Sequence, residues 1–258
     1  MEKEKKARED NDSAGKGRIY VVGIGPGGLK HLTARAKEAL QEADCVVGYK
    51  RYIGLVAPLL EGKEIFSNGM TEETERCRWA IEAALSGRTI AVVSSGDSGI
   101  YGMAGLILEL LKGRRVEVSV IPGVPAFVAA SALLGAPLMH DFASISLSDL
   151  LTEWAKIEER VEAAAKADFV IVLYNPKSSK RAEGLKKAIE IIRRHRNDKT
   201  PAGFVRNATR EGEEAIVTTL GDLGELSHKT DMLSIIIVGN SSTFTDNGKM
   251  ITPRGYNI

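Results

Sequence analysis

The chain has 258 residues, of which 43% are hydrophobic, and its 35 basic and 34 acidic residues leave a net charge of +1 at pH 7. This length and hydrophobic content suffice for one large domain, or two of ordinary size, with a proper core. Because the charges nearly cancel, nothing global favours nucleic acid or a membrane surface as a partner. Any attraction for an anionic ligand must be local.

The cysteines and the N-terminal residues indicate a protein of the reducing cytoplasm. Cys45 lies at the start of a predicted strand and Cys77 in a predicted helix, where buried structural thiols are commoner than a disulfide or a metal pair. No apolar run approaches the roughly 20 residues of a membrane span. Residues 1–17 are mostly charged or polar, so we expect a mobile tail and no signal peptide.

Short aliphatic segments alternate with helical patterns from residue 18 to residue 124. Thr33 and Thr71 are the expected N-caps of two of the helices, and the second helix is expected to run to Gly87. Strands are predicted at Arg18–Val22, Cys45–Val47, Lys63–Phe66, Thr89–Ser94 and Val116–Ile121, and a further helix at Tyr101–Leu111. The alternation predicts an α/β domain with a mostly parallel sheet and helices on both faces.

Proline and glycine at residues 122–125 interrupt this pattern, and we expect a domain boundary between residues 124 and 125. A small-residue helix over Ala126–Leu134 follows, and the alternation then resumes, which predicts a second α/β domain over residues 125–258, also with a mostly parallel sheet. Its strands are expected at Ala143–Leu147, Phe169–Tyr174, Ala202–Val205, Ala215–Thr219 and Leu233–Val238, and its helices at Glu153–Lys166 and Lys180–Arg194. Met250–Tyr256 is predicted to be a loop.

Two glycine-rich turns follow aliphatic strands of the first half. Residues 23–28 read Gly-Ile-Gly-Pro-Gly-Gly, and residues 94–99 read Ser-Ser-Gly-Asp-Ser-Gly. Glycine lets a backbone turn sharply and approach a ligand, and open α/β sheets bind ligands at the carboxyl ends of their strands. We therefore expect the turns to form two walls of one site, in which Asp97 accepts from a ligand amine or ribose hydroxyl. The structural alternative is an ordinary strand-to-helix turn capped by Asp97.

The first turn formally matches the dinucleotide-binding pattern G-x-G-x-x-G, but a lone match is weak. The best helix cap, Thr33, lies well beyond Gly28, and Pro26 removes one backbone donor. Tyr-Lys-Arg at 49–51 stands where the ribose-binding acid would be expected. An NADP-dependent oxidoreductase in which Arg51 binds the 2′-phosphate is thus a weaker alternative.

Basic residues of the second half would suit a substrate that carries carboxylates. Arg206 and Arg254 are the best candidates, because they flank turns predicted on the ligand side. His140 and Asp141 follow a proline turn and are a candidate catalytic base with its orienting acid, although a structural histidine is the commoner case. No Ser-His-Asp set, zinc-ligand spacing or Walker loop is apparent, and we expect no protein-bound metal.

Taken together, these motifs resemble the tetrapyrrole (corrin/porphyrin) methylase family, from about Arg18 to Tyr256. They are Val-Val-Gly-Ile-Gly-Pro-Gly at 21–27, Val-Gly-Tyr at 47–49, Ser-Ser-Gly-Asp-Ser-Gly-Ile-Tyr-Gly-Met at 94–103 and Ile-Pro-Gly-Val-Pro-Ala at 121–126. Segments 134–142, 173–176, 205–208 and 252–256 look like the subgroup that methylates C-17 of a precorrin. Ser98 departs from the family pattern, in which proline often follows the aspartate.

The resemblance implies two α/β domains with S-adenosylmethionine (SAM) in the cleft between them, usually in a homodimer. It implies methylation of C-17 of precorrin-3B, or of its cobalt-bound counterpart, with ring contraction in cobalamin biosynthesis. By motif position, SAM contacts are implied for Gly96, Asp97, Ile100, Pro125, Ala126, Tyr174, Asn207 and Ala208. Gly25 and Pro26 are implied to face the tetrapyrrole substrate.

Other functions stay open on the sequence. They include another SAM-dependent methyltransferase of the family, a non-catalytic module that binds SAM or its product, and methylation of RNA or of a protein side chain. The near-neutral charge argues mildly against RNA. Since the sulfonium of SAM is already a strong electrophile, methyl transfer needs chiefly an in-line approach and exclusion of water, and few catalytic residues are expected.

Overall fold

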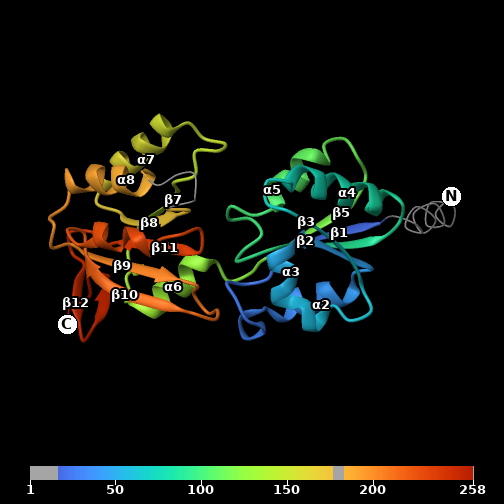
Figure 1. Ribbon diagram of the computed structural model, residues 1–258, viewed down its shortest axis with the longest axis horizontal. Coiled ribbons are helices and arrows are strands. Elements are labelled where there is room, and N and C mark those ends of the chain that lie inside the picture. Colours follow the sequence, from blue (N-terminus) through green and yellow to red (C-terminus); the bar gives the residue numbers. More distant parts are fainter. Residues whose placement is uncertain (1–16, 177–182, 258) are drawn as a thin grey trace. The chain divides into compact units, whose positions relative to one another are not determined.

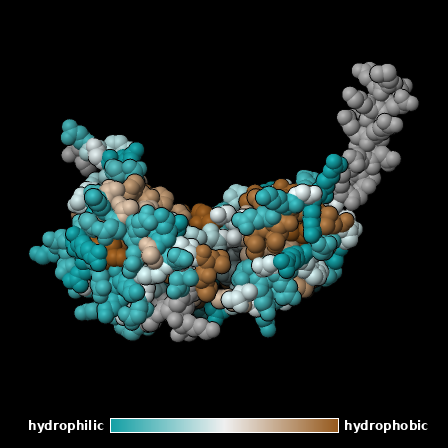
Figure 2. Space-filling model, turned by 90° about the horizontal axis from the view of Figure 1, so that it is seen from above, coloured by the Kyte–Doolittle hydropathy of each residue, from teal (hydrophilic) through white to brown (hydrophobic). Residues whose placement is uncertain are grey.

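The computed structural model describes residues 17–176 and 183–257, and its contacts divide the chain into two compact units, residues 1–126 and 127–258 (Figure 1). Charged and polar side chains cover much of the visible surface of each unit (Figure 2). Across the described residues, none of the helices is both long enough and apolar enough to cross a membrane.

The N-terminal unit is built on a five-stranded, wholly parallel sheet with the strand order β3-β2-β4-β1-β5. The strands are β1 (Arg18–Gly23), β2 (Cys45–Tyr49), β3 (Glu64–Asn68), β4 (Thr89–Ser94) and β5 (Glu117–Ile121). The helices are α2 (Ala34–Glu42), α3 (Lys50–Val56), α4 (Glu73–Leu85) and α5 (Ala104–Leu110), with short 3-10 turns η1 (Leu29–His31) and η2 (Ala57–Leu59). The predicted parallel α/β architecture is confirmed for this unit.

Alternate residues of β1 belong to two separate cores. Tyr20 and Val22 pack with residues of α2 and α3, whereas Ile19 and Val21 pack with residues of α4 and α5. Successive side chains of a strand point to opposite faces, so a strand covered on both faces reads as a continuous apolar run. This is why β1, β2 and β4, which are buried on both faces, can be recognised in the sequence.

The C-terminal unit has a five-stranded sheet of order β10-β9-β11-β8-β7 in which only β7 and β8 are parallel. Its strands are β7 (Phe142–Ser146), β8 (Val170–Tyr174), β9 (Pro201–Arg206), β10 (Glu214–Thr219) and β11 (Ser234–Val238). The prediction of a mostly parallel second sheet is therefore wrong. Only residues 207–213 connect β9 to β10, and so short a link joins antiparallel neighbours, because a parallel crossover needs a dozen or more residues.

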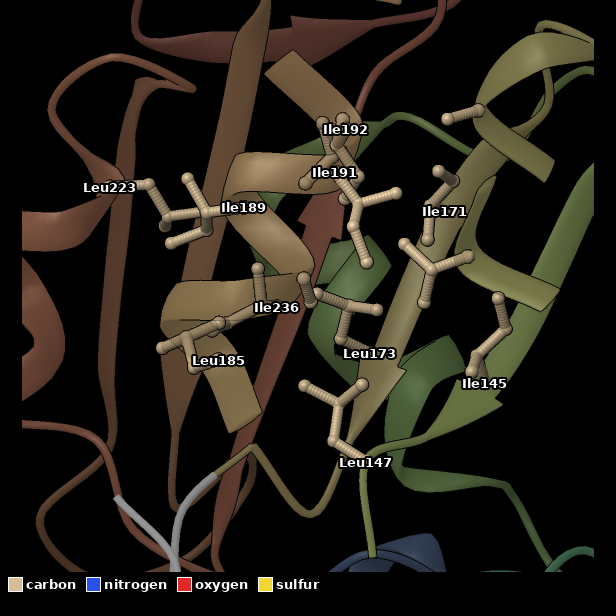
Figure 3. Packing of buried hydrophobic residues seen from close by; sticks show 14 of the residues in the cluster. Ile145, Leu147, Ile171, Leu173, Leu185, Ile189, Ile191, Ile192, Leu223 and Ile236 are labelled. Carbon is tan, nitrogen blue, oxygen red and sulfur yellow. The ribbon is translucent and has the colours of Figure 1, made fainter. Parts of the chain in front are cut away.

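Helices α7 (Trp154–Lys166) and α8 (Gly184–Arg193) pack on one face of this sheet. Figure 3 shows the isoleucine and leucine side chains of α8 gathered with Ile171 and Leu173 of β8 and Ile236 of β11. On the other face, Leu134 at the end of α6 (Ala126–Leu134) fits against Gly203, where a Cβ would lie 2.3 Å from a leucine methyl carbon. The start predicted for α8 at Lys180 lies outside the described residues.

Several local predictions are settled by the hydrogen bonds. Thr33 caps α2 as expected, since its hydroxyl accepts from the Ala36 N–H at 3.1 Å. Thr71 does not cap α4, because it has a φ of +71° and Glu72 is the residue at the N-cap. Cys45 and Cys77 are buried and free, as predicted, and burial raises the pKa of the Cys77 thiol to about 12.

Three short strands, two of them near the C-terminus, were not expected. β6 (Gly135–Ala136), β12 (Phe244–Asp246) and β13 (Lys249–Ile251) form a small sheet of order β12-β13-β6. The predicted loop over Met250–Tyr256 is therefore wrong at its start, where Met250 is fully buried in β13, and correct from residue 252 onward. The six-residue 3-10 helix η3 (Leu223–His228) connects β10 to β11.

The packing of the core under α8 leads us to predict the effect of a core substitution on stability. Leu173→Ala removes a fully buried side chain and leaves a cavity, so the free energy of unfolding should fall by about 2–5 kcal/mol in urea denaturation. Leu151→Ala is the matched control, because Leu151 is 99% exposed and its truncation should change stability by less than about 0.5 kcal/mol. Equal losses in the two variants would contradict the packing described.

Candidate functional site

The carboxyl ends of the five parallel strands lie along one edge of the N-terminal sheet. Pairing places Gly23 of β1 level with Ser94 of β4, and Tyr49 of β2 level with Asn68 of β3. The two glycine-rich turns and residues 122–125 therefore leave the sheet side by side, since β4, β1 and β5 are neighbours. This is the edge at which open α/β sheets bind ligands.

Three glycines bring these strand ends into backbone contact. A Cβ on Gly123 would lie 2.3 Å from the Gly96 oxygen and 2.6 Å from the Gly23 carbonyl carbon, and a Cβ on Gly23 would lie 2.6 Å from the Gly123 nitrogen. Real Cβ atoms do not approach other atoms so closely, so positions 23 and 123 require glycine. The three loops can approach this closely because these positions carry no side chain.

Gly25 and Gly96 join the two glycine-rich turns directly. The Gly25 N–H donates to the Gly96 oxygen at 3.0 Å, and the Gly96 N–H donates to the Gly25 oxygen at 2.7 Å. Both residues have positive φ angles, +76° and +70°, which glycine adopts without strain. The expected proximity of the two turns is confirmed.

The half-buried carboxylate of Asp97 is tied to backbone at both oxygens. Its Oδ1 accepts from the Gly99 N–H at 2.8 Å within its own turn, and its Oδ2 accepts from the Gly123 N–H at 3.0 Å in the turn after β5. Each carboxylate oxygen can accept a further hydrogen bond. Asp97 thus fixes two turns and retains acceptor capacity for a ligand donor, so the structural and ligand-binding interpretations are compatible.

Ser98, the departure from the family pattern, is fully buried. Its hydroxyl donates to the Ile121 oxygen at 3.1 Å, and its own carbonyl accepts from the Ala104 N–H at 3.0 Å. The Ser94 hydroxyl accepts from the Met103 N–H at 3.1 Å in the same loop. These hydrogen bonds restrain the turn where a proline ring would otherwise stiffen it.

The remaining N-terminal candidates for cofactor contact surround Gly96. A Cβ built on Gly96 would lie 3.4 Å from the Ala126 nitrogen and 3.8 Å from the Pro125 Cα, so these residues are in contact. Ile100 lies on the same loop and is 37% exposed. The structure therefore brings Gly96, Asp97, Pro125 and Ala126 together, with Ile100 close by in the chain.

The C-terminal candidates lie at one edge of the second sheet. Tyr174 ends β8, and its hydroxyl accepts from the Phe127 N–H at 3.2 Å. Asn207 and Ala208 follow β9, which runs in the same direction as β8 because both are antiparallel to β11. Asn207 has a φ of +53° and donates its backbone N–H to the Leu233 oxygen at 3.1 Å. These residues belong to one edge, on two strands separated by β11.

The two predicted substrate arginines differ in their surroundings. Arg206, at the end of β9, donates from Nε to the Asp231 carboxylate at 2.8 Å and keeps its two terminal nitrogens as further donors. Arg254 is exposed in the irregular C-terminal stretch, and within the described residues it has neither an ion pair nor a side-chain hydrogen bond.

The side chains of His140 and Asp141 lie close together but do not hydrogen-bond to each other. The His140 Nδ1 accepts from the Asp141 backbone N–H at 2.8 Å, while the Asp141 carboxylate stands 3.8 Å from that nitrogen, beyond hydrogen-bond distance. Both side chains are exposed. The Asp141 carboxylate makes no hydrogen bond to the ring in this geometry, because Nδ1 already accepts from the backbone N–H, and the orienting role of Asp141 stays a prediction.

A cavity of about 630 Å³ at the ends of β2 and β3 was not expected as a site. It is lined by Tyr49, Lys50, Arg51, Ser67, Asn68 and Gly69. The sequence signal is the Tyr-Lys-Arg segment at 49–51, whose two cations indicate a site for an anionic group but do not predict a cavity. The other half of the cavity lining comes from the end of β3 and Gly69. The sequence alone does not show that β3 lies beside β2.

Comparison with known proteins decides the family. The model for the tetrapyrrole (corrin/porphyrin) methylases matches residues 18–224. The chain belongs to this family. The protein is therefore a methyltransferase by descent, and its α/β fold is that of its relatives.

Individual relatives are similar over most of the chain. A probable cobalt-factor III C(17)-methyltransferase of Salmonella typhimurium is 51% identical over 93% of this chain and 100% of its own length. A precorrin-3B C(17)-methyltransferase of a Sinorhizobium species is 38% identical over 88% of this chain and 90% of its own. The crystal structure of the methyltransferase CobJ matches with a TM-score of 0.87 at 35% identity, over 92% of this chain and 100% of that one.

A longer relative is also similar. The cobalt-factor III methyltransferase of Priestia megaterium is 50% identical over 93% of this chain, which spans only 45% of that protein's length.

From the backbone contact between Gly123 and Gly96 we predict the effect of a substitution at the site. Gly123→Ala places a Cβ against the Gly96 oxygen, so the turns must separate, the free energy of unfolding should fall by about 1–3 kcal/mol, and SAM affinity should fall. The measurements are thermal unfolding and calorimetric titration with SAM. Gly105→Ala in α5, where a Cβ meets nothing within 4 Å, is the control and should be neutral or slightly stabilising. Unchanged SAM affinity in Gly123→Ala would contradict the role given to this contact.

Proposed function

We propose that the protein transfers a methyl group from SAM to C-17 of precorrin-3B or its cobalt-bound counterpart, with ring contraction, in cobalamin biosynthesis. The observation that carries this is the 51% identity to a relative named as a probable cobalt-factor III C(17)-methyltransferase, matched over that protein's whole length. Identity to the relative named for precorrin-3B is lower, at 38%, which favours the cobalt-bound substrate.

For SAM we propose contacts at both strand edges. On the N-terminal unit they are Gly96, Asp97, Ile100, Pro125 and Ala126, and on the C-terminal unit Tyr174, Asn207 and Ala208. The N-terminal set fits a nucleoside ligand, because a glycine-lined backbone surface stands beside a carboxylate with acceptor capacity left. That one SAM molecule contacts both sets is part of the proposal and follows from the family resemblance.

The chain's residues would bind and orient the reactants. SAM supplies an electrophilic methyl group, so the protein must align the accepting carbon and keep water away. Gly25 and Pro26, in the turn bonded to Gly96, are proposed to face the tetrapyrrole. Arg206 and Arg254 are proposed to hold its carboxylates through guanidinium donors.

His140 and Asp141 stay candidates for proton movement. With Nδ1 accepting a backbone hydrogen bond, the neutral His140 ring carries its proton on Nε2, which is the atom able to donate. His140→Ala with unchanged product and unchanged rate would remove both from the mechanism.

We also propose a cytoplasmic homodimer. Support for the dimer is the family resemblance, and support for the cytoplasm is the pair of free, buried thiols. Sedimentation velocity of the full chain tests the dimer, and a sedimentation coefficient typical of a 27.8 kDa monomer would overturn it.

The deciding experiment is a methyl-transfer assay with labelled SAM. Incubation with precorrin-3B and, separately, with its cobalt-bound form should yield a labelled product heavier by one methyl group from at least one of them. A labelled product only with other tetrapyrroles would reassign the substrate within the family. Tight NADPH binding without SAM binding would instead establish the oxidoreductase alternative, and SAM binding without any turnover would indicate a sensing module.

Substitution of Asp97 tests the proposed SAM site. Asp97→Ala should weaken SAM binding roughly 10- to 100-fold, since a hydrogen bond to a charged group is worth about 1.5–3 kcal/mol. Asp97→Asn keeps one acceptor and should lose less. Calorimetric titration measures the affinities, and circular dichroism confirms that the cores, which Asp97 does not enter, are intact. Undiminished SAM affinity in Asp97→Ala would overturn the assignment.

A further inference from the structure

The cavity at the ends of β2 and β3 is separate from the two glycine-rich turns at residues 23–28 and 94–99. Its lining comes from the last residue of β2, the first two of α3 and the end of β3 with the glycine that follows. At about 630 Å³ it is in the size range of small-molecule binding sites. All of it belongs to the N-terminal unit.

The charge that lines this cavity is entirely positive. Lys50 and Arg51 are both exposed there, and no aspartate or glutamate is among the lining residues. Among the described residues neither cation has an ion-pair partner or a side-chain hydrogen bond, whereas most other arginines of this unit are paired with glutamates. The paired arginines are Arg18, Arg35, Arg76, Arg88 and Arg114.

Polar and aromatic groups complete the lining. The Oδ1 atom of Asn68 is buried without a hydrogen-bond partner, while its Nδ2 donates to the Glu72 oxygen at 3.2 Å. A buried acceptor that lacks a partner is costly unless a ligand or water supplies a donor. The ring of Tyr49 packs edge-on against Tyr52, with centroids 5.2 Å apart. The cavity therefore combines cations, an unused acceptor and an aromatic ring.

The cavity stands level with the cofactor turns along the same sheet edge. Asn68 pairs with Tyr49, and β2 lies beside β4, whose Ser94 pairs with Gly23. From β3 to β1 there are three strand spacings, or roughly 14 Å. A large flat ligand that contacts the turn at Gly25 is thus able to reach the cavity with its periphery.

We propose that this cavity binds carboxylate side chains at the periphery of the tetrapyrrole, and that Lys50 and Arg51 are specificity-determining residues for that substrate. The inference rests on the proposed function, because it takes an acidic tetrapyrrole as the ligand. The guanidinium of Arg51 suits a bidentate carboxylate contact, and the ammonium of Lys50 adds a second charge. The methyl donor plays no part in these contacts.

The test uses the full chain and the double variant Lys50→Gln/Arg51→Gln. Uroporphyrin, a stable porphyrin with carboxylates at its periphery, serves as the binding probe, and its methyl ester serves as the uncharged comparison. In fluorescence titrations the double variant should bind uroporphyrin at least 10-fold more weakly than the unmodified protein and with a weaker dependence on salt. Affinity for the ester and for SAM should not change.

Lys112→Gln is the matched control, because Lys112 is an exposed lysine between α5 and β5, at the amino end of β5 and so at the opposite edge of the sheet. It should bind uroporphyrin as the unmodified protein does. In the methyl-transfer assay the double variant should raise KM for the tetrapyrrole at least 10-fold and change kcat less than threefold. A merely structural role for the two cations would lower SAM affinity and the melting temperature as well.

Failure of this inference is distinguishable from failure of the proposed function. If the double variant binds uroporphyrin as tightly as the Lys112→Gln control, the inference is wrong even where methyl transfer by the unmodified protein is observed. If the unmodified protein transfers no methyl group but the double variant still loses uroporphyrin affinity, the proposed function fails and the cavity assignment stands. Loss of NADPH binding in the double variant, with uroporphyrin binding intact, would assign the cations to a phosphate and overturn the inference.

Discussion

The close approach of three backbone turns at Gly23, Gly96 and Gly123 is the constraint on which the candidate site depends. Their strands are neighbours in the order β4-β1-β5, so the three turns leave the sheet within two strand spacings. At that separation the loops can touch only where no Cβ intervenes. The paired hydrogen bonds between Gly25 and Gly96 and the Asp97 bond to Gly123 then fix the contact. A ligand at this edge meets backbone directly.

Asp97 connects this constraint to the proposed SAM site. Its carboxylate is held by two backbone donors, so its position is set before any ligand arrives. A group that is already ordered loses little conformational entropy on binding, which raises affinity without adding contacts. The buried Ser98 hydroxyl, bonded to the Ile121 oxygen, has the same effect on the next residue. The sequence pattern at residues 94–99 thus encodes both a rigid turn and an acceptor.

The strand order of the N-terminal sheet determines the face on which each helix lies. The chain moves in one direction along the sheet from β1 to β2 and β3, and in the other direction from β3 to β4 and β5. Right-handed crossovers place the helices of opposite movements on opposite faces. This explains why α2 and α3 share one core and α4 and α5 the other. It also explains why both faces of β1, β2 and β4 are buried, which made these strands recognisable in the sequence.

The sequence does not determine the direction of a strand in its sheet, the identity of its neighbours, or the backbone angles at a helix end. Apolar periodicity locates β9, β10 and β11 well but does not record strand direction, so the antiparallel second sheet was missed. Thr71 has the chemistry of an N-cap, yet its backbone has a positive φ and cannot serve as one. The cavity beside Arg51 needs β3 next to β2, and the sequence does not state that adjacency.

A chain of net charge +1 can still attract an acidic ligand where its cations are locally unpaired. Most arginines of the N-terminal unit that lie away from the carboxyl edge are neutralised by glutamates, as in the pairs Arg18–Glu117 and Arg88–Glu64. Exposed pairs of this kind add little stability, but they cancel the field that a free cation would project. Lys50 and Arg51 carry their charge at a cavity whose lining residues include no aspartate or glutamate. Local attraction therefore survives at that edge of the sheet although the global charge is nearly zero, and this is where a ligand with acidic groups around its periphery would be oriented.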